Sequence, residues 1–589
     1  MTTPSLPEIR PAEPSPARVR ELVPADSTRA EMDAALAILR AQVRPWAELA
    51  ISDRRAILQE LIKDFGEVAG RWSDACGRAE GLTGPAAGEK WLTGPYMILR
   101  NMALLERTLG EIERYGKPKI PGPVKTRPNG TTTARVFPTD GWDSLFYSGV
   151  VGEVWMQPGV TPDSLPSTMA TAYAEADDSS SGAGGLCLVL GAGNVSSIGP
   201  MDLLSKLFVD RQVTLLKIHP VNAFLGPLIE EGMRALVDWG VLRVVYGGVE
   251  TGEYLCGHRE VDEIHITGSD KTVEAIVFGT GEEGEKRRRE RRPRNTKPIS
   301  SELGNVSPVI VVPGPWSQSD LAYQSENISS MLTNNAGFNC NAARVLIQHS
   351  GWEKRQALLD TVREQLAETP SRYAYYPGAV DRWRAFVAEH PEAEALSVAA
   401  DGELPWTLIS DVDPAKRDDI CFQQEAFCGV FAETALEAES PADFLDRAVS
   451  FCNDTLWGTL NATILVHPVS LRDKETRAAF ERALDDLNYG TVAVNAWAAI
   501  GYGLVVTPWG APPGHDLYDI QSGSGLVHNT LMFDRVQKTV VRVPFRMWPK
   551  PVWFRSHRTA RAMAEKVTRF EQGPSLTKLP GIFWEALRG

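Results

Sequence analysis

The sequence predicts an α/β protein with two lobes, each built around a parallel β-sheet. Between residues 185 and 269, short apolar runs that end in glycine or in a polar residue alternate with amphipathic runs, as in GLCLVLGAG, MDLLSKLFVD and VTLLKIHP. A second alternating series follows, with strands expected in SPVIVVPG, AARVLIQH and TVAVNAW and a helix in AYQSENISSMLTNNA. Such alternation is typical of parallel strands joined by crossover helices. Ligands bind these sheets beyond the carboxyl ends of the strands, so polar residues after each strand are the candidate site residues.

The N-terminal part opens with helices and then changes character. Ser27 and Ser52 precede the amphipathic runs TRAEMDAALAILRAQV and DRRAILQELIKDFGEVA, and we expect them to be N-caps. From Thr131 to Val160 the apolar stretches are short and broken by Gly and Pro, which predicts strands or an extended arm. The Pro-rich residues 1–26 lack the apolar run of a signal peptide, and we expect them to be flexible.

Length and composition exclude several classes of protein. The 589 residues allow about two to four structural units at roughly 100 to 200 residues each. The formal charge of −14 argues against a nucleic-acid binder, which needs a basic surface. The seven scattered cysteines fit neither a disulfide framework nor a zinc site. This cysteine usage predicts a cytoplasmic protein without a metal, and the absence of an apolar run of roughly 18 residues predicts that the chain has no membrane span.

Six separate motifs carry candidate chemistry. A glycine-rich turn or a single cysteine is weak evidence alone, because the first is often a packing device and the second is usually an inert core residue. The motifs occur in a fixed order, however. They contain Asn194 in GAGNVSSI, Lys217 in LLKIHP, Gly268 and Ser269 in HITGSD, Glu302 in SELGNVSP, Cys340 in NNAGFNCNAAR, and Glu425 in QQEAFCGVF.

In order and approximate spacing these motifs resemble the aldehyde dehydrogenase superfamily, from about Val150 to about Pro544. The resemblance implies Cys340 as the nucleophile that attacks an aldehyde carbonyl, with Asn194 in the oxyanion hole. It implies Glu302 as the base that activates water to hydrolyse the acyl thioester. The expected reaction is NAD(P)-dependent oxidation of an aldehyde to a carboxylic acid, and the expected fold has two Rossmann-like lobes and a β arm for oligomerisation.

The same resemblance implies a nicotinamide dinucleotide site. Lys217 matches the lysine that contacts the adenosine ribose, Gly268 and Ser269 the helix start that meets the pyrophosphate, and Glu425 the glutamate that holds the nicotinamide ribose. Many NAD-preferring members carry a glutamate three residues after the lysine, where this chain has Pro220, preceded by His219. The missing carboxylate and a nearby basic His219 slightly favour NADP over NAD.

Three further positions bear on the substrate. Most hydrolytic members have a glutamine shortly before the nucleophile and a second glycine after ELG, whereas this chain has Phe338 and Asn305. Phe338 is expected to narrow the substrate tunnel or to make its lining more aromatic. Asn495 in LNYGTVAVNAW takes the position that lines this tunnel in the family.

The resemblance also implies a domain organisation and a homodimer or homotetramer. The strand VQKTVVRVP is expected to be an exposed edge that pairs with another subunit. The expected parts are a flexible N-terminus (1–26), a cofactor-binding domain (27–130 and 166–301), an oligomerisation arm (131–165 and 526–545), a catalytic domain (302–525) and a basic aromatic extension (546–589).

Two segments lie outside the motifs. The run from Arg287 to Arg294 is expected to be a solvated loop, with steering of a phosphorylated ligand as the alternative. The tail after Pro544 is expected to pack on a neighbouring subunit; contact with an anionic membrane surface is the less favoured alternative.

Two other functions are considered. A CoA-dependent acyl-CoA reductase, or acylating dehydrogenase, would use the same thioester, but it has no use for a water-activating Glu302. A catalytically silent structural or binding protein on this fold would have lost Cys340, Asn194 or the glutamates, and all of them are present.

Overall fold

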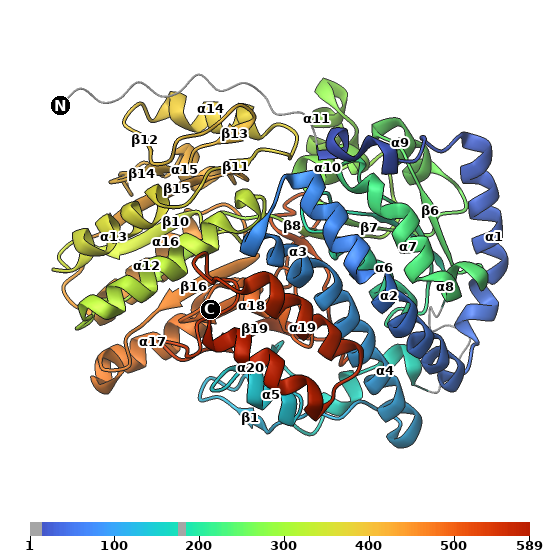
Figure 1. Ribbon diagram of the computed structural model, residues 1–589, viewed down its shortest axis with the longest axis horizontal. Coiled ribbons are helices and arrows are strands. Elements are labelled where there is room, and N and C mark those ends of the chain that lie inside the picture. Colours follow the sequence, from blue (N-terminus) through green and yellow to red (C-terminus); the bar gives the residue numbers. More distant parts are fainter. Residues whose placement is uncertain (1–14, 175–183) are drawn as a thin grey trace.

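The computed structural model describes residues 15–174 and 184–589, and within them the chain forms two sheets with helices around each (Figure 1). The first sheet has six strands in the order β18-β8-β7-β4-β5-β6. Neighbours from β8 to β6 run parallel, and β18 is antiparallel to β8. The strands are β4 (Leu186–Leu190), β5 (Val213–Lys217), β6 (Leu242–Val245), β7 (Glu263–Gly268), β8 (Ile299–Leu303) and β18 (Gly523–Ser524).

Helices from the N-terminal half cover this sheet. A shared core of buried side chains joins three long N-terminal helices to β4, β5 and β6. The helices of this half are α1 (Arg29–Ala47), α2 (Ile51–Glu80), α3 (Gly88–Trp91), α4 (Met97–Tyr115), α5 (Gly141–Phe146), α6 (Ile198–Phe208), α7 (Gly226–Gly232), α8 (Arg234–Asp238), α9 (Val249–Gly257), α10 (Asp270–Phe278) and α11 (Gly281–Arg289).

The second sheet has eleven strands in the order β1-β2-β3-β19-β17-β16-β9-β10-β15-β14-β12. These strands are β1 (Val124–Thr126), β2 (Thr132–Phe137), β3 (Val151–Met156), β9 (Pro308–Val311), β10 (Val345–His349), β12 (Glu394–Ala395), β14 (Thr407–Ile409), β15 (Val430–Leu436), β16 (Asn461–Leu465), β17 (Thr491–Val494) and β19 (Val536–Arg542). A separate pair is formed by β11 (Arg372–Tyr373) and β13 (Glu403–Leu404).

Alternate residues of the second sheet belong to two different cores. In β9, Val309 and Val311 pack in one buried cluster and Ile310 in another, as the period of two in a strand requires. Both faces of the sheet are therefore covered by helices. The helices of this half are α12 (Gln318–Thr333), α13 (Arg355–Ala367), α14 (Ala379–Glu389), α15 (Ile420–Gln423), α16 (Pro441–Asp454), α17 (Lys474–Asp486) and α18 (Ala499–Gly503), and the C-terminal helices are α19 (Ala560–Gln572) and α20 (Leu579–Leu587).

The structure confirms the α/β class and the strands expected from the apolar runs, and it corrects several details. Thr28 caps α1 in a capping box with Glu31, whereas Ser27 bonds to the Tyr246 backbone. Ser52 lies inside α2, whose N-cap is Ala50. The expectation of a flexible N-terminus is wrong for Ser15–Leu22, which forms a 3-10 helix, while residues 1–14 lie outside the described part.

The strand expected to be an exposed edge is an interior strand. β19 pairs in parallel with β17 and antiparallel with β3 of the same chain, and Val540 and Val541 are fully buried. Its backbone groups are already paired, so the edge argument for a homo-oligomer is wrong, and the homodimer or homotetramer stays a prediction without that support. β8 spans residue 301, where the boundary between the cofactor-binding and catalytic domains is expected. We therefore propose that these two domains divide after β8.

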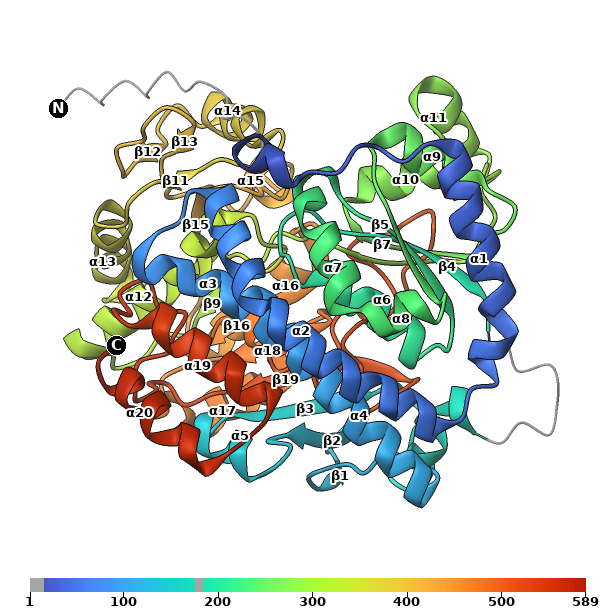
Figure 2. The same cartoon turned by 45° about the vertical axis from the view of Figure 1, so that its right-hand side comes forward.

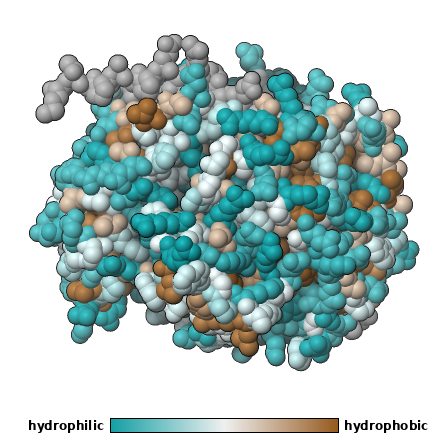
Figure 3. All heavy atoms as spheres, viewed as in Figure 1, coloured by the Kyte–Doolittle hydropathy of each residue, from teal (hydrophilic) through white to brown (hydrophobic). Residues whose placement is uncertain are grey.

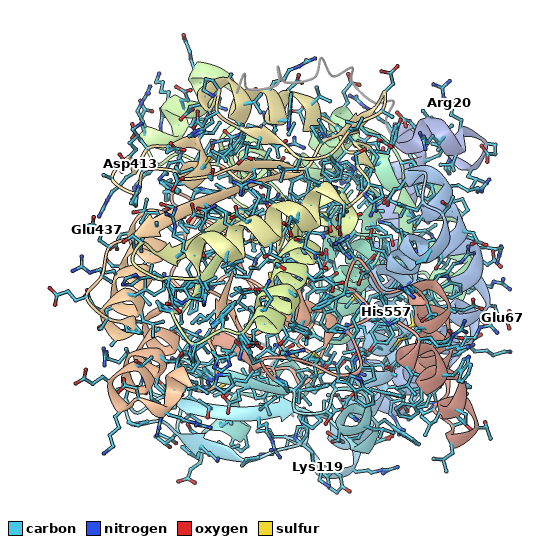
Figure 4. All side chains as sticks on the ribbon, turned by 60° about the vertical axis from the view of Figure 1, so that its left-hand side comes forward. Arg20, Glu67, Lys119, Asp413, Glu437 and His557 are labelled. Carbon is cyan, nitrogen blue, oxygen red and sulfur yellow. The ribbon has the colours of Figure 1, made fainter. Side chains whose placement is uncertain are left out.

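The C-terminal extension, which is expected to pack on a neighbouring subunit, packs on helices of its own chain. In Figures 1 and 2, α19 and α20 lie beside α4 and α5, and α19 also contacts α2 and α3. His557 precedes α19 and is 1% exposed; Figure 4 places it beside these helices, whereas Asp413 and Glu437 lie at the periphery. Among the described residues, no helix is both long enough and apolar enough to cross a membrane.

Candidate active site

All eight predicted site residues line one cavity of about 1300 Å³. Asn194, Lys217 and Gly268 come from the carboxyl ends of β4, β5 and β7, where a parallel sheet places its ligands. Glu302 comes from β8, and Cys340 and Glu425 come from loops of the second lobe. Residues up to 231 positions apart in sequence, from Asn194 to Glu425, therefore share one space.

Cys340 is presented by an unusual loop between α12 and β10. Three consecutive residues, Asn335 to Gly337, have positive φ angles of 52°, 55° and 79°. This conformation is costly for the two residues that are not glycine, so surrounding contacts must hold it. All seven cysteines lie in the described part of the chain; six are buried, and Cys340 alone is half-buried.

Asn335 supplies those contacts and was not singled out from the sequence. Its amide nitrogen donates to the backbone oxygens of Asn194 and Phe338 at 3.0 and 3.1 Å. Its side-chain oxygen accepts from Lys90 Nζ at 2.7 Å and from the Tyr375 hydroxyl at 2.9 Å. Asn335 therefore ties the loop of the cysteine to the loop of Asn194, which no local sequence pattern reveals.

Asn194 lines the cavity and its side chain is 8% exposed. The side-chain amide donates one hydrogen bond to the Phe338 carbonyl at 3.0 Å. An amide nitrogen carries two hydrogens, so a second donor remains for a group in the cavity.

Glu302 is a buried carboxyl next to the cysteine. It is 4% exposed, and burial raises its pKa to about 7, although hydrogen bonds from Trp509 and Cys340 oppose the shift. The Trp509 ring nitrogen donates to Glu302 Oε1 at 3.0 Å. Burial and the neighbouring carboxylates Glu302 and Glu425 raise the pKa of the Cys340 thiol well above its usual value. The thiol therefore rests protonated beside a carboxyl that can take up its proton near neutral pH.

A second network holds the backbone of Cys340. Asn461 donates to the Cys340 carbonyl at 3.2 Å and to Asn305 Oδ1 at 3.1 Å. The Ser307 hydroxyl also reaches Asn305 Oδ1, at 2.9 Å. Asn305, which departs from the glycine of related sequences, is fully buried in this network. The Asn side chain thus has a structural role that only the fold reveals.

Glu425 lines the cavity from the second lobe, and its carboxylate lies beside Gly304, the residue that follows β8. Its Oε1 atom is buried and has no hydrogen-bond partner, and burial raises its pKa to about 8. A Cβ atom at Gly304 would overlap the Glu425 carboxylate, so glycine in the ELG motif is what lets this side chain enter. A buried acceptor without a partner is costly, and it points to a ligand that donates hydrogen bonds.

Lys217 is the last residue of β5, and His219 follows the strand. Burial lowers the pKa of Lys217 to about 8. Burial and the charge of Lys217 lower the pKa of His219 to about 4, and its Nδ1 accepts from the Val221 N–H at 3.2 Å. His219 is therefore neutral at pH 7 and cannot attract a phosphate by charge, which corrects the expectation placed on it.

Ser269 caps α10, whose first turn borders the cavity beside Gly268. Most of the arginine run is exposed, as expected, but the expected loop is wrong for Arg287 to Arg289, which form the end of helix α11. Arg294 and the nearby Lys297 nevertheless line the cavity. Lys217, Arg294 and Lys297 therefore form a group of three basic side chains at the end of the cavity near β5 and α9.

Residues 215–378 match the family described as "Aldehyde dehydrogenase family". The chain is 30% identical over 302 residues to human 4-trimethylaminobutyraldehyde dehydrogenase, covering 47% of this chain and 53% of that protein. It is 27% identical over 301 residues to aminoacetaldehyde dehydrogenase of Pseudomonas aeruginosa, covering 48% and 52%. The match to the bovine 4-trimethylaminobutyraldehyde dehydrogenase spans 26% of each chain at 30% identity. The chain thus spans between a quarter and about half of the length of these curated relatives.

Solved structures share the whole architecture. Gamma-glutamyl-gamma-aminobutyraldehyde dehydrogenase from Burkholderia cenocepacia superposes with a TM-score of 0.58 at 18% identity, over 89% of this chain and 90% of that chain. The family match thus covers residues 215–378, and over most of the chain the fold is that of a solved aldehyde dehydrogenase. Glyceraldehyde-3-phosphate dehydrogenase from Methanocaldococcus jannaschii, solved with NADP, gives the same TM-score at 14% identity, over 88% of this chain and 95% of that chain. At these identities the likeness of the solved structures concerns the fold.

Two expectations about the substrate tunnel are wrong. The Phe338 ring is 1% exposed and packs against Tyr375 and Phe427 at centroid distances of 5.0 and 6.0 Å, so it does not narrow a tunnel. The Asn495 side chain accepts a hydrogen bond from the Val466 N–H at 2.8 Å. Asn495 lines neither of the two cavities that Cys340 borders. Trp497, two residues later, lines a second cavity.

One group of possible metal ligands occurs away from the cavity. Atoms of His390, Asp419 and Cys421 lie within 4.8 Å of one another. Both ring nitrogens of His390 are already within hydrogen-bond distance of carboxylates, Glu392 at 2.8 Å and Asp419 at 3.0 Å. These donors satisfy one another, and we assign no metal to them.

Proposed function

We propose that this chain oxidises an aldehyde to a carboxylic acid, with Cys340 as the nucleophile and a nicotinamide dinucleotide as the hydride acceptor. The observation that carries the proposal is the pairing of a half-buried cysteine with a buried carboxyl of pKa about 7. A carboxyl with this pKa can both accept and release a proton at neutral pH. The names of the curated relatives, which are aldehyde dehydrogenases, agree with this reaction class.

The first step forms a bond between Cys340 Sγ and the aldehyde carbon. The thiol proton passes to Glu302, and the carbonyl oxygen gains the negative charge of the tetrahedral thiohemiacetal. The free amide hydrogen of Asn194 and the backbone N–H of Cys340 are the donors we assign to that oxygen. Fixed donors are effective here because the site is buried and has a low dielectric.

The last step breaks the acyl–sulfur bond. Glu302 first releases the thiol proton to solvent; its carboxylate then takes a proton from water while the water oxygen attacks the acyl carbon, and Cys340 leaves as the thiolate. The products are a carboxylic acid and the free cysteine. Because Glu302 is available for this step, we favour water over CoA as the acyl acceptor.

The residues of the cavity fit a dinucleotide. When bound, the nicotinamide cofactor supplies the acceptor for the hydride of the aldehyde carbon. The unpartnered Glu425 carboxyl suits ribose hydroxyls, and the start of α10 at Ser269 suits the pyrophosphate. Lys217, Arg294 and Lys297 give the slight preference for NADP over NAD, since His219 is neutral.

A single assay plate tests the proposal. Reduction of NAD and NADP is followed with aliphatic and aromatic aldehydes, with and without CoA. We expect turnover without CoA. Turnover only with CoA would favour acyl transfer to CoA, and no turnover in any well would contradict the proposal.

Two variants test the roles of the residues. Glu302→Gln should abolish steady-state turnover, because neither the Cys340 thiol nor the attacking water then has its proton acceptor; any burst of reduced cofactor should form more slowly than in the wild type and then stall. Cys340→Ala should give neither burst nor turnover while still binding cofactor. Unchanged steady-state rates in either variant would reject that residue's role.

A further inference from the structure

A second cavity starts at Cys340 and runs away from the first. Its volume is about 230 Å³, and Cys340 borders both cavities. The nucleophile therefore lies where the two spaces meet. If the large cavity holds the cofactor, as proposed above, the small one is where the rest of the aldehyde must lie.

The C-terminal extension forms one wall of this second cavity. Residues 549–553 border it, followed by Met563, Val567 and Phe570 of α19 and Ile582 and Phe583 of α20. Figures 1 and 2 show these two helices as an outer layer over α4 and α5. Without residues 549–586 this side of the cavity would be open to solvent.

The opposite wall comes from the N-terminal half and is also apolar. Tyr96 and Met97 at the start of α4 and Leu145 and Phe146 of α5 border the cavity. The hydroxyls of Tyr96 and Tyr147 bond to each other at 2.7 Å, so they satisfy one another. Leu145 is 44% exposed, which places this end of the cavity at the surface. In Figure 3 hydrophobic residues gather at the lower edge of the face, where Figure 1 shows α5 and α20.

The charged side chains of the wall each have a partner in the protein. Glu89 pairs with Arg372 at 3.1 Å and Glu571 with Arg100 at 3.0 Å. Lys550 donates to the Ser556 hydroxyl at 2.7 Å. A cationic group on a substrate would lose its hydration in this cavity without gaining a free carboxylate, because Glu89 and Glu571 are already paired, and this loss is costly.

The extension is held firmly in place. The buried Arg100 of α4 bonds to Glu571 of α19 and to Asp143 of α5, at 3.0 and 2.8 Å. The Phe570 ring also makes edge contacts with Phe146 at a centroid distance of 5.0 Å. One cation thus joins both walls, so the cavity is a fixed part of the fold.

We propose that residues 549–586 form a substrate-selecting wall, and that the preferred substrate is an aldehyde with an uncharged apolar chain of about nine carbons. The size follows from comparison with an apolar cavity of about 150 Å³, which accommodates benzene, since 230 Å³ is about half as large again. The inference rests on the proposed aldehyde oxidation at Cys340. This apolar substrate differs from the amino- and trimethylamino-aldehydes in the names of the curated relatives, because those aldehydes carry a cation.

The inference predicts a dependence on chain length. Each methylene that enters the cavity is worth about 0.8 kcal/mol, so kcat/KM should rise about fourfold per carbon. The rise should stop at about nine carbons, when the cavity is full. An aldehyde that ends in an ammonium group should be used far less well than the alkyl aldehyde of equal length.

The decisive variant is Val567→Trp, which fills the cavity from α19. It should lower kcat/KM for nonanal by at least tenfold and leave propanal within about threefold, because a short substrate does not reach Val567. Arg569→Trp is the matched control, since Arg569 lies on the same helix and its side chain is 66% exposed. The control should leave both aldehydes unchanged.

Binding of 1-nonanol, which cannot be oxidised as an aldehyde, separates this inference from the proposed function. Calorimetry should show nonanol binding to the wild type and to Arg569→Trp, and much weaker binding to Val567→Trp. If the enzyme oxidises short or cationic aldehydes in preference to nonanal, or if Val567→Trp reduces propanal and nonanal equally, the inference is wrong while the proposed function stands. If nonanol binds as expected but no aldehyde is oxidised, the apolar site stands and the proposed reaction fails.

Discussion

The pH dependence of the reaction should be controlled by the hydrogen bond from Trp509 to Glu302. The Trp509 ring nitrogen donates to the carboxylate at 3.0 Å and so stabilises its ionised form. Trp509→Phe keeps an aromatic ring beside Tyr502 but removes the donor. The pKa of Glu302 should therefore rise above about 7, and the enzyme should need a higher pH to reach full rate.

The size of the shift follows from the strength of the bond. A hydrogen bond to a charged group is worth about 1.5–3 kcal/mol, and about 1.4 kcal/mol corresponds to one pKa unit, so the pKa should rise by roughly one to two units. Glu302 is active as the ionised carboxylate, which predominates above its pKa. At pH 7 the ionised fraction would fall from about one half to between about one tenth and one hundredth, and the rate would fall about 5- to 50-fold.

The assay is the profile of kcat/KM against pH for the wild type and two variants. We expect the acid limb of Trp509→Phe to lie one to two units above that of the wild type, with the rate recovering at alkaline pH. Trp406→Phe is the matched control, because Trp406 is equally buried but donates to the Thr369 carbonyl, far from Glu302 in the fold. The reasoning is refuted if the limb of Trp509→Phe does not move, or if the control moves it as much.

Two further predictions concern the cofactor site and the anchor of the extension. Gly304→Ala places a methyl group where the Glu425 carboxylate lies. The Kd of the nicotinamide cofactor should therefore rise by about tenfold, which corresponds to the loss of roughly one hydrogen bond to a charged group, while the free energy of unfolding should stay unchanged. An unaltered Kd in a fluorescence titration would remove Glu425 from the site. Arg100→Ala leaves two buried carboxylates without their cation and should lower the free energy of unfolding by about 3–5 kcal/mol in urea titrations. A loss below about 1 kcal/mol would show that solvent reaches this pair.

Much of the fold could be predicted because its strands are marked locally. β4, β5 and β7 are continuous apolar runs that end in glycine or a polar residue, and this pattern holds in any environment that buries both faces of a sheet. β8 was missed because ISSEL has only two apolar residues. Its strand geometry comes from pairing with β7 and β18, which belong to other parts of the chain.

The helix starts and the tail show the same division. Ser27 and Ser52 are reasonable N-cap residues, but a neighbouring Thr28 forms the better capping box in one case and a longer helix includes the serine in the other. The tail has small and apolar residues at helical spacing, with Ala560, Ala564, Thr568 and Phe570 buried. That pattern predicts that the helix packs on another surface, but it does not say which surface. In the fold this surface is formed by α3 and α4 of the same chain.

The sequence by itself determined which residue types are available and in what order, so it could place Cys340, Asn194, Glu302 and Glu425 together by their motifs. Only the tertiary structure decided their chemical state. Trp509, which hydrogen-bonds Glu302, is 207 residues away from it, and the wall opposite α4 comes from the far end of the chain. Acidity and cavity shape depend on such distant neighbours, because desolvation and packing act through space and leave no local pattern in the sequence.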